Sequence, residues 1–485
     1  MELPPIATLT QIQAAFAEGS LTPRALLDHS LQRAQEADSV FICLTESRAR
    51  QAAQAATVRW QNKQALGLLD GIPLSWKDLF DQAGEVTRAA SLTTAQAAPK
   101  AHDAVAVALL ESIGAVSLGR TNLTEFAFSG LGLNPHFGTP ANAWSQSEAL
   151  APGGSSSGAA LSVALGIVPY SMGTDTSGSV RIPAALNGLA GFKPGSGRLS
   201  RIGVWPLSTT LDSIGPLAHT VADICTVMQA FAVDADRVSD RHFKAIVPEG
   251  LYSEAVEPQI AQAFEDSIRK LQQAGVKIIR QPLPSLNRIP ELFSQYGTLI
   301  GLEAWQLHQD SLAQAALMDE RVAKRLLSNQ AYPPQNLCEL LAWRSRLQQN
   351  IAAELAGALL LMPTTAIDAP PLARLEQDQD YFFACNQQIL RNTMATSFLD
   401  MPSLTLPTGL NRNGLPAALM VSAPVGHEET VLAAGREFAL PFAGGFHAAH
   451  ALRMGFGHEA ASLARRQRAQ LVECPSWEQH RCALR

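Results

Sequence analysis

The chain has 485 residues, of which 16% are charged and 47% are hydrophobic, and its formal net charge is −6. Soluble proteins average about 25% charged residues, but the hydrophobic share is ordinary, so the composition excludes a disordered chain and a coiled coil. The negative net charge provides no basic surface for phosphate backbones, so we expect no direct contact with nucleic acid.

Neither export nor membrane insertion is indicated. The first ten residues, MELPPIATLT, lack the basic and apolar regions of an export signal, and no apolar run reaches the roughly 18 residues of a membrane span. The six cysteines are scattered without a CxxC pair, which is typical of neither a zinc ribbon nor a disulfide framework. We therefore expect a cytoplasmic protein that has no membrane contact.

The first hundred residues predict helices that lead into a strand. Thr10 and Gln13 have the spacing of a capping box, and Thr22-Pro23 is typical of the start of a second helix. The short apolar segment 71–76 predicts a strand that ends at Lys77. A lysine at the end of an apolar strand is a candidate functional residue.

From residue 103 onward, helical and extended patterns alternate. One helix is predicted from residue 103 to about residue 112, and further helices at 159–165, 221–231, 259–273 and over much of 285–356. Strands are predicted at 115–118, 168–172, 276–279, 359–362, 403–406 and 417–421. Strands that alternate with helices predict an α/β fold around one sheet of mixed direction.

The chain shows no internal repeat and no clear linker, so we expect residues 5–440 to form a single large domain. Residues 441–485 differ in character, because they combine histidines and an Arg-rich run with weak periodicity. We expect this tail to be a solvated or poorly ordered extension. No HExxH-like pair accompanies the histidines, so no metal site is predicted, and no cofactor is expected.

The Gly/Ser-rich segment 153–158 contains GSSSG, which matches the GxSxG nucleophile elbow of α/β-hydrolases with Ser156 as the nucleophile. An elbow requires a strand directly before the motif, whereas the preceding segment 147–152 ends in proline, which cannot donate to a sheet. We therefore do not favour the elbow. The SxxK match at Ser267 lies in a charged amphipathic helix without its companion motifs, and we treat it as chance.

A second Gly/Ser-rich segment, 173–179, follows a predicted strand, which is where α/β sheets place their functional sites. Small residues just before Ser179 would allow successive backbone N–H groups to converge on one point, as in an oxyanion hole or an anion nest. Tight turns also use such residues, so this segment alone does not define a site.

The two segments together, with the lysine upstream, resemble the amidase signature hydrolases. The resemblance is carried by GGSSSGA at 153–159, GTDTSGSVRIPA at 173–184 and GFKP at 191–194. Supporting matches are GIP at 71–73, GRTN at 119–122, LDSIGP at 211–216, MPS at 401–403, PTG at 407–409 and GLP at 414–416. The resemblance spans roughly residues 5–440, and it implies a mixed central sheet with helices on both faces.

The resemblance implies a Ser-Ser-Lys triad. Ser179 would be the nucleophile that forms an acyl-enzyme, Ser155 the bridging serine after a cis peptide bond, and Lys77 the base. Physical chemistry agrees, because a hydroxyl needs a neighbouring base and a lysine can be that base only where desolvation keeps it neutral.

The resemblance also implies supporting residues around the triad. Backbone N–H groups of Thr176, Ser177 and Gly178 would form the oxyanion hole, although Ser177 stands where the family commonly has glycine. Asp175, Arg181 and Ser156 would orient the catalytic groups. Phe126, Phe128 and Leu131 could line an acyl pocket or simply pack in the core.

These observations favour a stand-alone amidase that acts on a small-molecule amide, with a homodimer left open. One alternative is the amidase subunit of a glutamyl-tRNA amidotransferase, which releases ammonia from glutamine inside a complex. Residues 128–135 lack the Ser-Ser-Thr-Glu stretch typical of that subunit. The other alternative is a non-catalytic interaction protein that keeps the fold, but the presence of all three triad residues argues against it.

Overall fold

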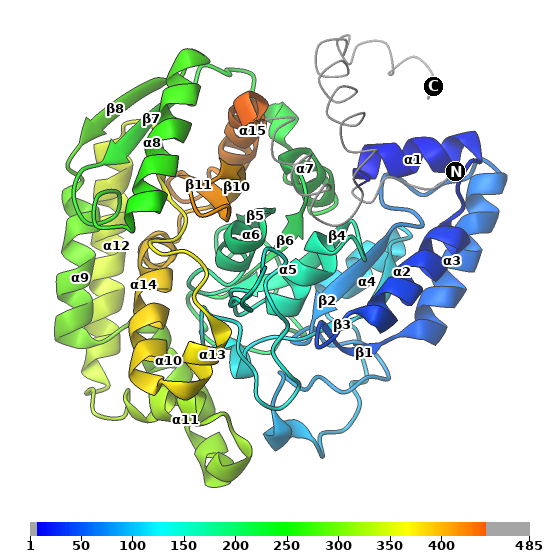
Figure 1. Cartoon of the computed structure of the whole chain (residues 1–485), viewed down its shortest axis with the longest axis horizontal. Helices are drawn as coiled ribbons and strands as arrows, with labels where there is room; N and C mark the ends of the chain where they lie inside the picture. Colours follow the sequence, from blue (N-terminus) through cyan, green and yellow to red (C-terminus); the bar gives the residue numbers. More distant parts are fainter. Residues whose placement is uncertain (1–6, 443–485) are drawn as a thin grey trace.

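The computed structural model describes residues 7–442, which form one eleven-stranded sheet and the helices around it (Figure 1). The strand order is β1-β3-β2-β4-β6-β5-β10-β11-β9-β7-β8. Strand β2 is parallel to β3 and β4, and β7 is parallel to β8 and β9, whereas the remaining pairs are antiparallel. The predicted single sheet of mixed direction is therefore confirmed.

The strands are β1 (Phe41–Leu44), β2 (Pro73–Lys77), β3 (Val116–Thr121), β4 (Tyr170–Asp175), β5 (Ala190–Lys193), β6 (Ser213–Ala218), β7 (Lys244–Pro248), β8 (Lys277–Gln281), β9 (Leu359–Pro363), β10 (Ser403–Leu410) and β11 (Pro416–Ser422). The α-helices are α1 (Leu9–Glu18), α2 (Pro23–Glu36), α3 (Glu46–Gln61), α4 (Val105–Ser112), α5 (Ser157–Ala164), α6 (Arg181–Asn187), α7 (Val221–Gln229), α8 (Pro258–Gln273), α9 (Pro284–Tyr296), α10 (Leu299–His308), α11 (Glu320–Leu327), α12 (Gln335–Leu355), α13 (Leu372–Gln377), α14 (Gln379–Phe398) and α15 (Glu428–Ala439).

Helices cover both faces of the sheet, as predicted. Along β9, side chains alternate between two core clusters because successive residues of a strand point to opposite faces. Leu359 and Leu361 pack with residues of α7, α8 and α15, whereas Leu360 and Met362 pack with residues of α9 to α12. The predicted helical excursion near 285–356 is thus the layer that covers one face at the β9 end.

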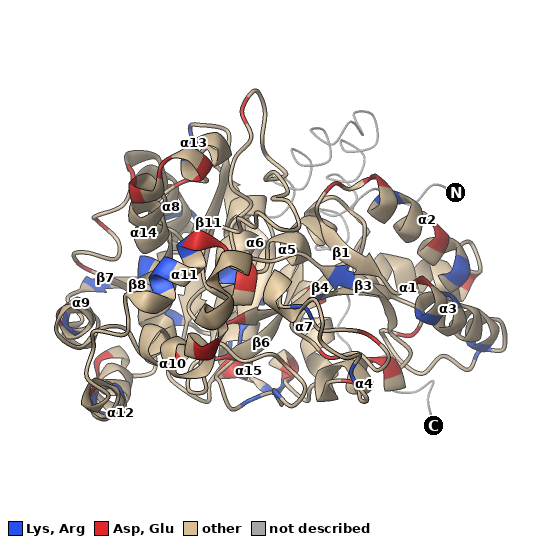
Figure 2. Cartoon of the chain, turned by 90° about the horizontal axis from the view of Figure 1, so that it is seen from below, with Lys and Arg blue, Asp and Glu red and all other residues tan. Residues whose placement is uncertain are grey.

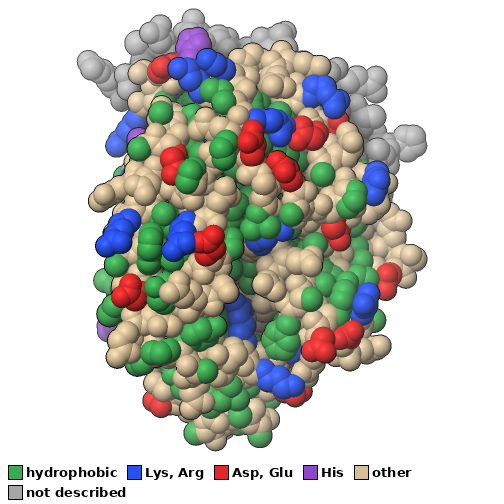
Figure 3. Space-filling model, turned by 90° about the vertical axis from the view of Figure 1, so that its left-hand side faces the viewer, with side chains coloured by type: hydrophobic (Ala, Val, Ile, Leu, Met, Phe, Trp, Pro, Cys, Tyr) green, Lys and Arg blue, Asp and Glu red, His purple; other side chains and the backbone are tan. Residues whose placement is uncertain are grey.

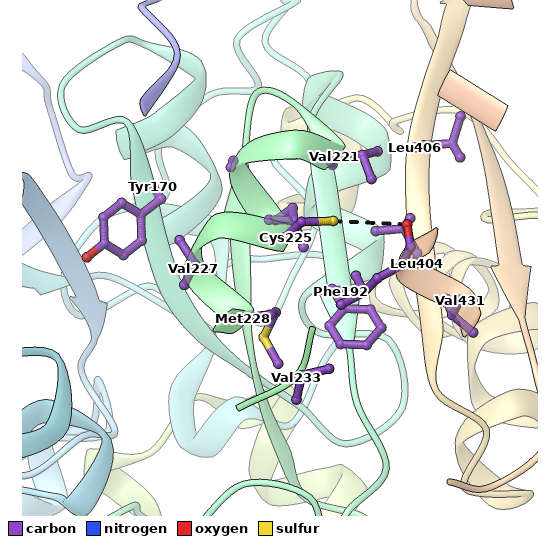
Figure 4. Close-up of a cluster of buried hydrophobic side chains, with 14 of the residues drawn as sticks. Tyr170, Phe192, Val221, Cys225, Val227, Met228, Val233, Leu404, Leu406 and Val431 are labelled. Carbon is purple, nitrogen blue, oxygen red and sulfur yellow. Dashed lines mark hydrogen bonds between the residues drawn. The ribbon is translucent and has the colours of Figure 1, made fainter. Parts of the chain in front are cut away.

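Helix α7 shows how such a layer is held. Its residues Val221, Cys225 and Met228 pack against Phe192 of β5 and Leu404 of β10, and the Cys225 thiol lies 4.0 Å from the carbonyl oxygen of Leu432 (Figure 4). Burying one large apolar side chain contributes about 1.5–3 kcal/mol, so this cluster fixes the helix against the strands.

One predicted helix start is wrong by two residues. The capping box at α1 uses Thr8 and Gln11, not Thr10 and Gln13: the Thr8 hydroxyl accepts from the Gln11 amide, and the Gln11 side chain accepts from the Thr8 amide. The second predicted start is confirmed, because the Thr22 hydroxyl caps α2 at the amide of Ala25.

Charged residues are concentrated on outer helices such as α2, α3 and α13 (Figure 2). The fully buried cations Lys77, Arg120, Arg181 and Lys193 are exceptions, and each lies in or beside a central strand. No helix within residues 7–442 is long and apolar enough to cross a membrane. The predicted tail lies almost wholly outside the described residues.

Candidate active site

Lys77 is the last residue of β2, where the parallel strands β2 and β4 bring their carboxyl ends to one edge. Its Nζ atom donates to the hydroxyl of Ser155 at 2.7 Å and to the hydroxyl of Thr174 at 2.8 Å, and it lies 3.4 Å from the Thr174 carbonyl oxygen. The predicted pairing of Lys77 with Ser155 is therefore present in the structure.

The environment of Lys77 changes its protonation. The side chain has no exposed surface, and burial lowers its pKa to about 7, although the negative charges of Asp175 and Asp212 oppose this shift. A lysine with this pKa is neutral in a substantial fraction of molecules near pH 7, so its Nζ atom can accept a proton.

Ser155 lies in the loop before α5, and the Gly154–Ser155 peptide bond is cis, as the resemblance implied. The Gly154 amide donates to the carbonyl of Gly130 at 2.8 Å, and a Cβ on Gly154 would lie 2.5 Å from the Gly132 nitrogen. The close approach of these backbones requires glycine at position 154, and it fixes Ser155 beside the segment 128–131.

Ser179 lies between β4 and α6, and the Ser156 amide donates to its carbonyl at 3.2 Å. This bond brings the two Gly/Ser-rich segments together. Among the described residues, none hydrogen-bonds to the Ser179 hydroxyl, and only 3% of this residue is exposed. The Ser179 hydroxyl therefore has no protein partner in the described part of the chain, and no hydrogen bond joins it to the Lys77–Ser155 pair.

Asp175 and Arg181 form a fully buried ion pair, with an Nη2–Oδ1 distance of 2.9 Å. Asp175 also accepts from the amides of Gly178 and Val180. Burial alone would raise the pKa of Asp175, but the guanidinium of Arg181 outweighs it and lowers the pKa to about 2. The carboxylate therefore stays ionised and fixes the backbone on both sides of Ser179.

One member of the predicted oxyanion hole is unavailable. The Gly178 amide donates to Oδ1 of Asp175 at 2.7 Å, so the prediction for Gly178 is wrong in this geometry. Within the described part of the chain, the amides of Thr176, Ser177 and Ser179 have no hydrogen-bond partner. Three N–H groups within residues 176–179 thus remain without a protein partner.

The elbow alternative at Ser156 lacks its structural context. No named strand lies between β3 and α5, and only an isolated bridge joins Leu150 to Pro371. The Ser156 hydroxyl is fully buried and donates to the Thr174 carbonyl at 3.3 Å. Ser156 therefore supports the loop that carries Lys77's partner and does not face a substrate.

Two polar residues of the site were not among our candidates. Thr174 receives the second hydrogen bond of Lys77. Asp212, which is 9% exposed, accepts from the hydroxyl of Thr176 at 2.6 Å and from the amides of Leu207 and Ser208. Both lie inside motifs that carried the family resemblance, 173–184 and 211–216, so their positions were visible while their contacts were not.

A cavity of about 350 Å³ adjoins the site at Thr174, the second hydrogen-bond partner of Lys77, whereas Lys77, Ser155 and Ser179 do not line it. It is lined by Thr174, Asp212, Leu79 and the loop 201–209. Pockets of 300–1,000 Å³ are typical for small ligands.

The three predicted pocket residues do not line that cavity. Phe126 stacks in parallel with the rings of Trp205 and His308 at centroid distances of 6.0 and 5.1 Å, so it lies behind the cavity wall. Phe128 and Leu131 are buried in core clusters.

The described residues contain no group of three His, Cys, Asp or Glu side chains that could hold a metal ion.

Comparison with known proteins agrees with this geometry. A family model described as Amidase matches residues 25–432. A 2-amino-5-chloromuconic acid deaminase from Comamonas testosteroni is 32% identical over 438 residues, which are 86% of this chain and 92% of that protein. A glutamyl-tRNA(Gln) amidotransferase subunit from Gluconobacter oxydans is 30% identical over 450 residues, 84% of this chain and 89% of the relative.

Solved structures give the same result. A crystal structure of an amidase superposes with a TM-score of 0.80 at 30% identity and covers 90% of this chain and 100% of that chain. The fold and the comparisons define a hydrolase with a mixed α/β fold that acts on carbon–nitrogen bonds other than peptide bonds. This chain belongs to the amidase family.

Proposed function

We propose that this protein is a stand-alone amidase that hydrolyses a small carboxylic amide through an acyl-enzyme on Ser179. The observation that carries the proposal is the buried contact of 2.7 Å between Lys77 and Ser155, next to a serine whose hydroxyl has no partner among the described residues. In this proposal Lys77 is the base, Ser155 the relay and Ser179 the nucleophile, which are the three roles that nucleophilic catalysis by a serine requires.

In the first half of the reaction, the Ser179 oxygen attacks the amide carbonyl carbon. Its proton passes to the Ser155 oxygen as the Ser155 proton passes to the neutral Nζ of Lys77. The carbonyl oxygen becomes an oxyanion, which the free N–H groups of Thr176, Ser177 and Ser179 would bind; removal of one such donor typically costs about 2.7–4 kcal/mol.

In the second half, the relay reverses. The proton on Lys77 returns through Ser155 to the amide nitrogen, the carbon–nitrogen bond breaks, and ammonia or an amine leaves. Water then attacks the ester on Ser179 and gives a proton to the relay, which returns it to the Ser179 oxygen as the carbon–oxygen bond breaks and the carboxylic acid leaves. The Asp175–Arg181 pair holds the backbone of the nucleophile loop during both halves.

The amidotransferase subunit remains the alternative, since one relative with high coverage carries that name. The Comamonas relative is named for an action on a small molecule, which favours a stand-alone enzyme. The cytoplasm remains the proposed location, because the four cysteines within residues 7–442 are free thiols.

Ammonia release from a panel of small amides tests the proposal. Ser179→Ala and Lys77→Ala should abolish turnover, and Ser155→Ala should lower kcat by about 10²–10⁴-fold. Ser156→Ala is the matched control from the same loop, and its kcat should fall less than tenfold.

Equal turnover in the wild type and in the Ser179 and Lys77 variants would exclude the mechanism. Labelling of Ser156 by a fluorophosphonate would restore the elbow alternative. Glutaminase activity that requires added subunits would favour the amidotransferase.

A further inference from the structure

A buried carboxylate on α10 binds one loop beside the proposed site. Charged side chains of both signs are scattered over the face of the molecule on the side of α9 and α12 (Figure 3), whereas Glu303 of α10 is only 4% exposed. Its two oxygens accept from four donors of one loop: the hydroxyls of Ser208, Thr209 and Thr210 and the amide of Thr210. The Thr209 hydroxyl and the Thr210 amide each lie 3.1 Å from the carboxylate. Burying a carboxylate is unfavourable unless hydrogen bonds compensate, so these contacts hold both Glu303 and the loop in one arrangement.

The same loop is also bound to Asp212. The Ser208 hydroxyl donates to Glu303 while the Ser208 amide donates to Oδ2 of Asp212 at 3.0 Å, so one residue contacts both carboxylates. The Leu207 amide donates to the same Oδ2 atom at 2.8 Å. Oδ1 of Asp212 accepts from the hydroxyl of Thr176 at 2.6 Å, in the segment that leads to the nucleophile. A continuous set of hydrogen bonds thus runs from α10 through the loop 207–212 to Thr176.

A second contact from α10 supports the start of this loop. Nε2 of His308 donates to the carbonyl of Pro206 at 2.8 Å, and the His308 ring stacks on that of Trp205 at a centroid distance of 6.1 Å. Residues 201–209 form one wall of the cavity, but no residue of α10 lines it. Helix α10 can therefore influence the site only through the loop that it holds.

The charge of Asp212 acts on the proposed base. The negative charges that raise the pKa of Lys77 are those of Asp175 and Asp212, and they oppose the larger effect of burial. Burial raises the pKa of Asp212, whereas hydrogen bonds from Thr176 and from two loop amides, with the positive charge of Arg201, lower it. Displacement of the loop would therefore move Asp212 and also remove contacts that keep it ionised. Both changes would lower the pKa of Lys77.

We propose that Glu303 is a positioning residue for the reaction: it fixes the loop 207–212, so that Asp212 stays bound to the Thr176 hydroxyl. This inference rests on the proposed amidase function and adds to it a residue that touches neither the nucleophile nor the cavity. A carboxylate suits this role, because its two oxygens can accept from all four donors of the loop at once. Small displacements of groups that position a reaction have large effects on rate, so loosening the loop should reach the proposed oxyanion donor at Thr176.

The pH profile of Glu303→Gln tests the inference. Glutamine keeps the shape of the side chain but replaces one accepting oxygen by an NH₂ group, which faces N–H and O–H donors. We expect the acid limb of kcat/KM to move to lower pH by about half a unit or more, in the same direction as in Asp212→Asn. On the plateau, kcat should fall about tenfold or more.

A double variant distinguishes positioning from a direct effect of the Glu303 charge. When Asp212→Asn is already present, Glu303→Gln should move the acid limb no further, because the charge through which it acts is gone. A limb that does not move in Glu303→Gln, or that moves equally with and without Asp212→Asn, overturns the inference.

The loop provides a second test from its own side. Thr210→Val removes one hydroxyl that donates to Glu303 and should move the acid limb in the same direction, whereas Thr210→Ser keeps the hydroxyl and should leave it in place. If Glu303→Gln does not fold, an unmoved limb in Thr210→Val overturns the inference. Glu354→Gln on α12 is the matched control, because this carboxylate likewise binds the hydroxyl and the amide of one residue, Ser285, at 2.6 and 3.2 Å. It should leave the midpoint unchanged.

A direct titration separates this inference from the proposed function. The pKa of Lys77 is measured by NMR in a chain that carries ¹³C-labelled lysine, with its resonance identified by its loss in Lys77→Ala. Amide turnover with an unmoved acid limb would support the amidase and overturn the role of Glu303. Absence of all turnover would overturn the amidase, and the NMR titration would still decide the inference: a lower Lys77 pKa in Glu303→Gln that depends on Asp212 supports it, and an unchanged pKa overturns it.

Discussion

The Nζ atom of Lys77 lies 2.7 Å from the hydroxyl oxygen of Ser155, and neither side chain has any exposed surface. Only a neutral lysine can accept the proton that this contact would deliver. Burial lowers the pKa of Lys77 to about 7, so protonation below that pH should remove the base. We expect kcat/KM to fall about tenfold per pH unit below pH 7 and to be level above it, as measured in a pH–rate profile.

Asp212 provides the control for this assignment. Its negative charge raises the pKa of Lys77, so Asp212→Asn should shift the acid limb of the profile to lower pH. An acid limb that does not move in Asp212→Asn would assign the titration to another group.

We expect the protein to lose stability when one partner of the Arg181–Asp175 ion pair is removed. Arg181→Met leaves the Asp175 carboxylate buried without its cation, and breaking a buried pair in this way typically costs about 3–5 kcal/mol. The free energy of unfolding at pH 7, measured by urea denaturation, should fall by this amount. The double variant Arg181→Met, Asp175→Asn should recover part of it, because the unpaired charge is then gone.

The pH dependence of this effect has a defined sign. Asp175 has a pKa of about 2 in the folded chain, below the ordinary value of 3.8. Its contribution is therefore complete above pH 3.8 and is lost as the pH falls through 2. The stability difference between the wild type and Arg181→Met should shrink with acidification over this interval. A difference independent of pH would show that Arg181 stabilises through packing and its bonds to α14 alone.

Apolar runs between turn residues predicted seven of the eleven strands; six of these are largely buried, whereas β8 is mostly exposed. Four strands, β1, β5, β6 and β7, were not predicted. Strand β5 is only Ala190–Lys193, and two of its four residues are alanine and glycine, so its extended conformation depends on pairing with β6 and β10. Such pairing is a non-local property that a local pattern does not contain.

The error at α1 has the same origin. Both Thr8 and Thr10 are followed by glutamine three residues later, so the local pattern fits both. The helix begins at Leu9, whose amide donates to the carboxylate of Asp223 on α7 at 2.9 Å. The observed helix start thus includes a hydrogen bond to a residue 214 positions away. The local sequence pattern does not contain that contact, so it could not distinguish a start at Thr8 from one at Thr10.

The site followed from the sequence only in part. The family motifs supplied Lys77, Ser155 and Ser179, but they could not show that Asp175 occupies the Gly178 amide. Hydrophobicity also suggested Phe128 as a pocket residue, whereas the structure places it beneath Arg325. Residue type indicates which groups can react; only the packed chain determines which of them are already bonded.

Gly178 should be indispensable for its backbone conformation and not for its N–H group. Its φ of +139° is rarely adopted by other residues, and a Cβ there would clash with the Thr393 hydroxyl and lie 2.6 Å from Ile182 Cδ1. Gly178→Ala should therefore distort the loop that carries Ser179. We expect kcat/KM to fall by about 10²-fold or more, since displacing reacting groups by about 1 Å can have that effect. The free energy of unfolding should fall by about 1–3 kcal/mol.

Gly197→Ala is the control, because a Cβ at Gly197 meets no atom within 4 Å. Amidase assays and urea denaturation of both variants provide the check: full activity in Gly178→Ala would mean that the oxyanion loop tolerates a different backbone path, and the assignment of Thr176, Ser177 and Ser179 as the N–H donors would then fail with it.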